Sequence, residues 1–203
     1  MSTPDFALAA PTPAAWADAA ARDPLALLSD HAHCELKAAA NAMTLLKRNP
    51  TRPGLALRLM PLVREETEHL HRVLRELDQR GSHLDHDTPN PYASRLQGTA
   101  RTTSRHGQAY LDALLVSALI ELRSHERFEC LAACPALADL HPLYAALREA
   151  EARHGELFTR LALEAHDEEL VEARFAELAQ VESTVLAELA PGSRVHSGWS
   201  GLA

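Results

Sequence analysis

Apolar residues recur at helical spacing along most of the chain, and Pro, Gly and Asn divide the pattern into segments. The segments predict one short and five long helices, at about residues 13–21, 25–48, 55–80, 108–133, 137–165 and 168–189. Pro61 lies inside the second long helix, where a kink or a later start is expected. Residues 82–105 are expected to form an irregular crossover with one helical turn near 92–96. Two helical hairpins joined by this crossover predict a helical bundle.

The composition agrees with an all-α fold. Aromatic residues make up 4% of the 203 residues and Gly occurs only 8 times, which disfavours sheets and glycine-dependent nucleotide loops. The main apolar stretch, near residues 113–120 and interrupted by Ser117, is too short to span a membrane. The N-terminus resembles no secretory signal, and the 3 cysteines form no CxxC pair. We therefore expect a single domain in a reduced, cytoplasmic protein.

Charge is distributed unevenly along the chain, whose net charge is −8. Residues 164–188 contain eight acidic residues and a single basic one, Arg174. Two other stretches, residues 47–58 and 88–111, contain basic residues and no acidic one. The acidic net charge therefore does not exclude a nucleic-acid partner, because phosphates respond to local basic loops. The candidates for phosphate contacts are Lys47, Arg48, Arg52, Arg95, Arg101 and Arg105.

The pattern Glu-x-x-His occurs three times, at Glu66/His69, Glu68/His71 and Glu151/His154. Residues three apart on a helix point to nearly the same side, so such a pair can bind one ion. The first and third pairs lie on apolar stripes and are expected to face the core. The second pair shares a face with arginines and is expected to be solvated. Helix phase therefore indicates the first and third pairs as candidate metal ligands.

Each inward pair is preceded by one Glu on the apolar face of the neighbouring helix. Glu35 lies 31 residues before Glu66, and Glu121 lies 30 residues before Glu151. In a bundle this duplication supplies four carboxylates and two imidazoles at one level of the core. Such a donor set balances the charge of two divalent ions and suits iron or manganese. The predicted metal ligands, which are also the predicted catalytic residues, are Glu35, Glu66, His69, Glu121, Glu151 and His154.

An alternative is a bundle that buries these polar groups without metal, by pairing them with arginines. Arg123, Arg127 and Arg153 are close enough in sequence for this interpretation. Four further polar residues near the predicted ligands are expected to lie outside the ligand set: His31, Cys34, His125 and Glu126.

Four stretches resemble those of one known family: DHAHCELKAA (30–39), REETEH (64–69), LIELRSHERF (119–128) and EAEARH (149–154). They are similar to the ferritin-like, di-iron tRNA 2-methylthio-N6-isopentenyladenosine hydroxylases. The resemblance covers about residues 25–165, and the chain length fits as well. Many di-iron proteins share the six ligands, whereas the residues that flank them are more specific to this family.

The resemblance implies a ferritin-like four-helix bundle with additional N- and C-terminal helices. A single ferritin-like di-iron domain would span residues 1–203, with its core at about 25–165 and an acidic helix at about 168–189. The implied enzyme is a non-haem di-iron monooxygenase that binds two iron ions through the six ligands. It would use O2 to hydroxylate the isopentenyl group of the modified adenosine beside the tRNA anticodon. Because the sequence has no flavin or nicotinamide motif, electrons would come from an external donor, a separate reductase.

Two other functions remain open from the sequence. One is a ferritin-like iron-oxidising or peroxide-reducing protein with the same six ligands. The absence of a rubredoxin-like pair of CxxC motifs and the long acidic fifth helix weigh against it. The other is a metal-free helical interaction module.

Overall fold

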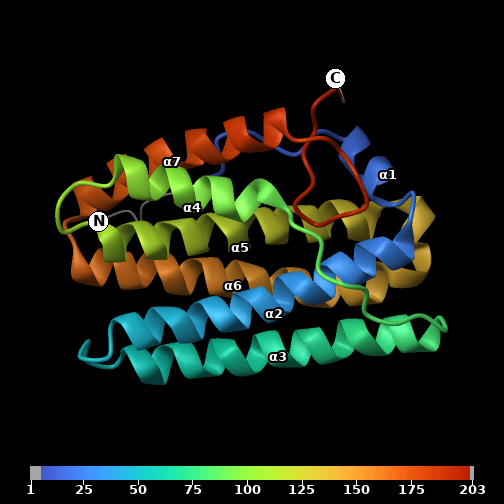
Figure 1. The fold of residues 1–203 in the computed structure, drawn as a ribbon, viewed down its shortest axis with the longest axis horizontal. Helices are drawn as coiled ribbons and strands as arrows, with labels where there is room; N and C mark the ends of the chain where they lie inside the picture. The colour runs from blue at the N-terminus through green and yellow to red at the C-terminus, as the bar shows by residue number, and fades with distance from the viewer. Residues whose placement is uncertain (1–5, 202–203) are drawn as a thin grey trace. The chain divides into compact units, whose positions relative to one another are not determined.

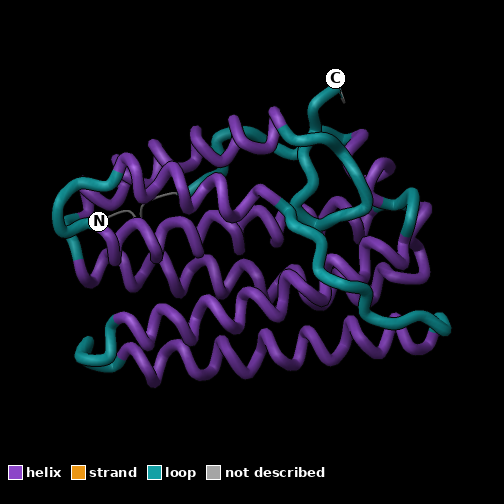
Figure 2. The backbone as a smooth tube through the Cα atoms, in the orientation of Figure 1, coloured by secondary structure: helices purple, strands orange, loops and turns teal. Residues whose placement is uncertain are grey.

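The computed structural model describes residues 6–201, and these residues form helices and loops without a strand (Figure 2). The elements in chain order are α1 (Ala15–Ala20), α2 (Pro24–Arg48), α3 (Leu55–Gln79), α4 (Pro91–Thr103), α5 (Ala109–Ala133), the 3₁₀ helix η1 (Pro135–Leu140), α6 (His141–Ala165) and α7 (Glu168–Glu188) (Figure 1). The predicted all-α fold class is therefore confirmed.

Contacts along the chain divide it into two compact units. The small unit comprises Ala20–Thr88 and Ser193–Val195, and it contains α2 and α3. The large unit comprises Met1–Ala19, Pro89–Gly192 and His196–Ala203, and it contains α4 to α7. The prediction of a single domain over residues 1–203 stays a prediction.

The small unit is an antiparallel hairpin of two 25-residue helices, α2 and α3 (Figure 1). Asp23 caps α2 because its side chain accepts a hydrogen bond from the backbone N–H of Ala26. Gly54 begins α3 with a positive φ of 72°, a conformation that residues with a Cβ rarely adopt. Helix α3 continues through Pro61 from Leu55 to Gln79, so the later start considered for this helix is wrong.

The large unit is built around the hairpin of α5 and α6, with α4 and α7 packed on α5 (Figure 1). Helix α5 has apolar residues on most of its faces and is buried on most of them, as expected of a helix with several helical neighbours. Arg174 of α7 joins three of the helices, because it donates to Asp112 of α5 at 2.8 Å and to the carbonyl of Ala100 of α4 at 3.1 Å. The large unit therefore has a polar network as well as an apolar core.

The crossover differs from the prediction, because it contains the 13-residue helix α4 instead of one helical turn. Asn90 caps this helix by accepting from the N–H of Tyr92, and Pro91 occupies its first turn. Tyr92, Leu96 and Ala100 are spaced by four residues and form its buried stripe. The predicted helix at 137–165 also differs, because a 3₁₀ helix precedes α6.

No single helix within residues 6–201 is long and apolar enough to cross a membrane. Helix α5 and the stretch Pro135–Ala165 reach the length and apolar composition of a membrane span only as a pair. A bend of 109° separates these two parts.

Candidate metal centre

The small unit carries three of the predicted ligands on its two helices. Glu35 lies on α2, Glu66 and His69 lie on α3, and all three are buried. One ligand atom from each lies within 4.8 Å of the other two. His69 Nδ1 is 3.5 Å from Glu35 Oε2 and 3.7 Å from Glu66 Oε2. We call these residues the small-unit triad.

His31 lies one helical turn before Glu35 and contacts it directly. The Nε2 atom of His31 is 2.6 Å from Oε1 of Glu35, and both side chains are buried. Burial by itself would raise the pKa of Glu35, but hydrogen bonds from His31 and His69 lower it well below its usual range. Burial would likewise lower the pKa of His69, but the carboxylates of Glu35 and Glu66 raise it to about 9. His31 was expected to lie outside the ligand set, and its contact with Glu35 was not predicted from the sequence.

The large unit carries the other three predicted ligands in the same arrangement. Glu121 lies on α5, Glu151 and His154 lie on α6, and all three are buried. One ligand atom from each lies within 4.8 Å of the other two. The two helices approach closely here, because a Cβ at Gly155 would lie 3.3 Å from Cγ of Leu122. We call Glu121, Glu151 and His154 the large-unit triad.

Each triad offers two carboxylates and one imidazole from a buried position. Buried charges of one sign are costly unless a counter-charge compensates them, and a divalent cation supplies that compensation. Oxygen donors combined with imidazole are typical ligands of iron, manganese and zinc. By its chemistry, each triad is therefore fit to hold a metal ion.

The family of the chain follows from comparison with known proteins. A sequence model of the family described as tRNA-(MS[2]IO[6]A)-hydroxylase (MiaE) matches residues 2–197. The chain belongs to this family. Its members are tRNA-modifying enzymes, which confirms the predicted hydroxylase class.

Two curated relatives carry the name tRNA 2-(methylsulfanyl)-N(6)-isopentenyladenosine(37) hydroxylase. The one from Pseudomonas putida is 38% identical and covers 96% of this chain and 93% of its own. The one from Salmonella typhimurium is 28% identical and covers 93% of this chain and 86% of its own.

A solved structure is also similar to this MiaE-family chain. It is named "Protein 43 with aldehyde deformylating oxygenase activity from Synechococcus". The match has a TM-score of 0.88 and 39% identity, and it covers 94% of this chain and 96% of that one. This likeness confirms the predicted ferritin-like fold.

Other polar residues that could compete for metal in a MiaE-family site have different roles here. Glu68 and His71 are exposed, as their helix phase predicts. Glu126 accepts hydrogen bonds from Arg123 and from the backbone and hydroxyl of Thr12. His125 Nδ1 lies 2.8 Å from the carbonyl oxygen of Arg148 and joins α5 to α6.

The arginines of the metal-free alternative are also engaged elsewhere. Arg123 donates to Glu182 of α7 at 2.8 and 2.9 Å and to the carbonyl of Ala10 at 3.0 Å. The guanidinium of Arg127 lies 4.3 Å from the ring centroid of Trp16. Burial and the nearby Arg123 lower the pKa of Arg127 to about 9. Arg153 is exposed and donates to a backbone carbonyl of its own helix.

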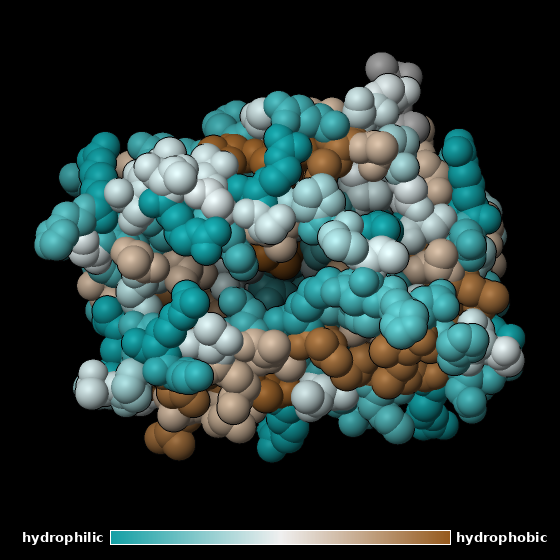
Figure 3. Space-filling view, viewed as in Figure 1, coloured by the Kyte–Doolittle hydropathy of each residue, from teal (hydrophilic) through white to brown (hydrophobic). Residues whose placement is uncertain are grey.

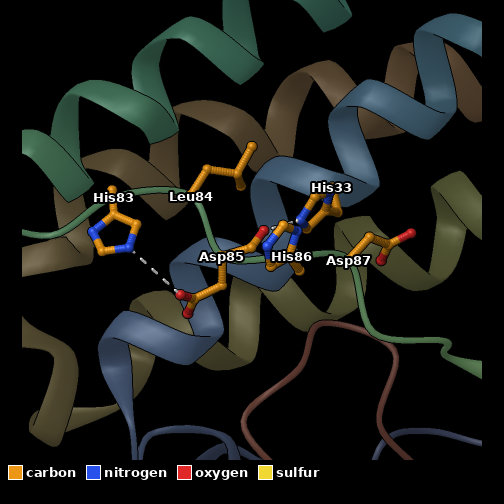
Figure 4. A pocket seen from close by; sticks show the side chains of 6 residues that line it. All are labelled: His33, His83, Leu84, Asp85, His86 and Asp87. Carbon is orange, nitrogen blue, oxygen red and sulfur yellow. Dashed lines mark hydrogen bonds and ion pairs between the residues drawn. The ribbon is translucent and has the colours of Figure 1, made fainter.

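A hollow of about 390 Å³ lies elsewhere on the small unit, over α2. It is lined by His33, His83, Leu84, Asp85, His86 and Asp87 (Figure 4). Helix α2 holds this loop, because Ser29 accepts from the N–H of Asp85 at 3.0 Å and Lys37 donates to Asp87 at 2.8 Å. His33 also donates to the carbonyl of Asp85 at 2.8 Å. The residues of this loop form no periodic pattern, so the sequence does not mark it as a candidate site.

The predicted tRNA contacts belong to both units, and all six are exposed. Lys47 and Arg48 end α2, and Arg52 lies in the turn that follows. Arg95 and Arg101 lie on α4, and Arg105 lies in the loop after it. Arg95 forms an ion pair with Glu188 of the acidic helix α7. The two clusters therefore differ in their surroundings.

Proposed function

We propose that this chain hydroxylates the isopentenyl group of 2-methylthio-N6-isopentenyladenosine, beside the anticodon of tRNA, by an O2-dependent reaction. The observation that carries the proposal is the match of residues 2–197 to the MiaE family in a chain that buries a Glu-Glu-His triad in each of two hairpins. The proposed reaction inserts one oxygen atom into a C–H bond, and the other oxygen atom leaves as water.

The proposed cofactor is a pair of iron ions, with the six residues of the small-unit and large-unit triads as the proposed ligands. The four carboxylates of the two triads balance the charge of two ferrous ions. When bound, iron supplies the electron transfer to O2 that side chains cannot provide. The chain itself holds the ligands in a buried setting that excludes water, and His31 orients Glu35 through their hydrogen bond. Electrons would come from an external donor, which we propose is a separate reductase.

Basic residues are the proposed contacts to the tRNA backbone, because neutralising phosphates contributes most of the affinity for nucleic acids. The candidates form one cluster in each unit: Lys47, Arg48 and Arg52, and Arg95, Arg101 and Arg105. Binding is then expected to weaken as the salt concentration rises.

A second candidate function is oxygenation of an aldehyde. It is favoured by one observation, the 39% identity to a solved protein whose name states aldehyde deformylating oxygenase activity. Both candidates use the same six ligands, so they differ in substrate and not in the metal site.

Mass spectrometry of nucleosides distinguishes these functions. Iron-loaded protein is incubated with O2, a chemical reductant and tRNA that carries the isopentenylated base, and in parallel with an aldehyde. We expect the hydroxylated nucleoside to form from the tRNA and the aldehyde to remain unconverted. Glu66→Ala is the inactive control, and Glu68→Ala, two residues away on the exposed face, is the matched active control. If protein with two irons bound makes no hydroxylated nucleoside, the proposed function is wrong.

A further inference from the structure

The free end of the α2–α3 hairpin has an unusual charge for a chain of net charge −8. We define the hairpin tip as residues 40–64, which comprise the last nine residues of α2, the turn and the first ten residues of α3. The tip contains five basic residues and no acidic one. All five are exposed: Lys47, Arg48, Arg52, Arg58 and Arg64. This segment is therefore a local positive surface on an acidic protein.

Large apolar side chains are exposed among these basic residues. Leu57 is 83% exposed, Met43 is 47% exposed and Met60 is 46% exposed. Leu57, Met60 and Arg64 follow the i, i+3, i+7 spacing, so they share one face of α3. Figure 3 shows hydrophobic atoms beside hydrophilic ones at the lower left, where α2 ends and α3 begins. Single exposed apolar residues are common on proteins, but a group of them inside a basic surface indicates a binding site.

The basic cluster of the crossover lacks this combination. Arg95 is paired with Glu188, and α4 packs along α7, a helix with many acidic residues. No large apolar residue of α4 is among the exposed ones, because Tyr92 and Leu96 are buried. An approaching phosphate would therefore meet nearby carboxylates at the crossover, whereas residues 36–64 contain none and only Arg64 has acidic neighbours in sequence, Glu65 and Glu68.

We propose that the hairpin tip is the surface that receives the anticodon loop of the RNA substrate. This inference rests on the proposed function and assigns its recognition step to one part of the chain. Basic side chains of the tip contact the phosphates, and Leu57, Met60 and Met43 contact the faces of unpaired bases. Loops expose such faces, whereas a duplex stacks them inside, so this mixture of contacts favours a single-stranded loop over a paired stem. The match to a family of tRNA hydroxylases favours RNA over an acidic protein as the partner.

The test measures the KM and the dissociation constant for an anticodon stem-loop that carries the isopentenylated base, with iron-loaded protein and a chemical reductant. The tip-charge variant is Lys47→Ala/Arg48→Ala/Arg52→Ala. We expect its dissociation constant and KM to rise at least tenfold with little change in kcat, because the lost contacts bind the substrate and the transition state equally. The slope of log affinity against log salt is expected to fall by about two to three. The comparison variant is Arg95→Ala/Arg101→Ala/Arg105→Ala, for which we expect a smaller loss of affinity than for the tip-charge variant, because Arg95 is paired with Glu188. The matched control removes three exposed basic residues outside both clusters, Arg22→Ala/Arg75→Ala/Arg160→Ala, and we expect less than a twofold change.

The tip-apolar variant, Leu57→Ala/Met60→Ala, separates base contacts from charge. Both side chains are exposed, so folding and iron content are expected to be unchanged. We expect a severalfold loss of affinity for the stem-loop with an unchanged salt slope, and no loss for a fully paired RNA of equal length.

Three results would overturn the inference. One is a KM for both tip variants that equals the KM of the wild-type protein, measured under conditions in which the wild-type protein hydroxylates the RNA. That result would leave the proposed function intact. Another is a larger effect of the crossover variant, or of the matched control, than of the tip-charge variant. The third is a defect that appears only with a protein electron donor and not with the chemical reductant, which would assign the tip to that donor. If the wild-type protein makes no product, the proposed function fails first and the inference fails with it.

Discussion

The small-unit and large-unit triads contain the same three ligand types in the same order, but the helices that carry them are supported differently. In the small unit, α2 and α3 are the only helices, and His31 contacts Glu35 within the hairpin. In the large unit, α4 and α7 pack on α5, and buried ion pairs join α5 to α7. At the position one turn before Glu121, matching His31, stands Ser117, whose hydroxyl donates to its own helix at Ala113.

The same duplicated sequence pattern is therefore supported in a different way in each unit. The large unit depends on buried ion pairs between distant segments, whose loss leaves an uncompensated charge. The small unit has a histidine, His31, in contact with the proposed ligand Glu35, and it has the basic hairpin tip. We therefore expect large-unit changes to affect folding most strongly and small-unit changes to affect metal and substrate.

The largest expected effect is loss of metal from either triad. Glu66→Ala in the small unit and His154→Ala in the large unit are each expected to abolish binding of two iron ions per chain. Most of the helicity should remain, because side-chain packing supplies most of the stability of a helical bundle. Iron analysis and circular dichroism check this. Retention of two irons in either variant would contradict the proposed ligand set, and Glu68→Ala and His71→Ala are the controls that should keep both.

The next effect is on stability and is specific to the large unit. Glu182→Ala leaves the fully buried Arg123 without its ion-pair partner on α7, and we expect a loss of about 3–5 kcal/mol in the free energy of unfolding. Removal of the exposed partner of Arg95, in Glu188→Ala, is expected to cost at most about 1 kcal/mol. Denaturant unfolding measures both. Equal losses would show that the buried network does not support α5 as described.

The sequence predicts the two hairpins well because long apolar stripes, caps and turn residues agree along 25-residue helices. It also predicts which Glu-x-x-His pairs are buried, since helix phase alone decides that. Helix α4 is missed because Gly98 and several Thr residues weaken its helical signal, although Asn90 and Pro91 mark its start. The Arg123–Glu182 pair joins residues 59 apart in the sequence, and no local spacing specifies such a partner.

A third effect concerns pH and the small-unit triad without metal. The carboxylates of Glu35 and Glu66 raise the pKa of His69 to about 9, above the ordinary value of 6.5. The folded state therefore binds the His69 proton more tightly than the unfolded state does. This contribution is fully present below pH 6.5 and is lost as the pH rises through about 9, with an upper limit of about 3 kcal/mol.

Denaturant unfolding of metal-free protein at pH 6.5 and pH 9 measures this contribution, with His69→Gln as the reference. The difference between wild type and variant should shrink at the higher pH. Iron affinity should instead rise over the same window, because the metal must displace that proton. A wild-type advantage that grows with pH would show that His69 is neutral in the folded, metal-free state.

The smallest effect tests the asymmetry between His31 and Ser117. His31→Ala removes the 2.6 Å contact with Glu35, and loss of such an orienting partner is expected to weaken iron binding about 10- to 100-fold. Ser117→Ala removes a hydroxyl that donates to the carbonyl of Ala113, so we expect less than a threefold change. Iron titration of the folded variants measures both, and the absorption spectrum of the bound iron should shift only in His31→Ala. His31→Gln, which keeps a hydrogen-bond donor, is expected to recover part of the affinity because the donor and not the ring orients Glu35. Equal iron affinity in His31→Ala and Ser117→Ala would show that the two triads are supported alike.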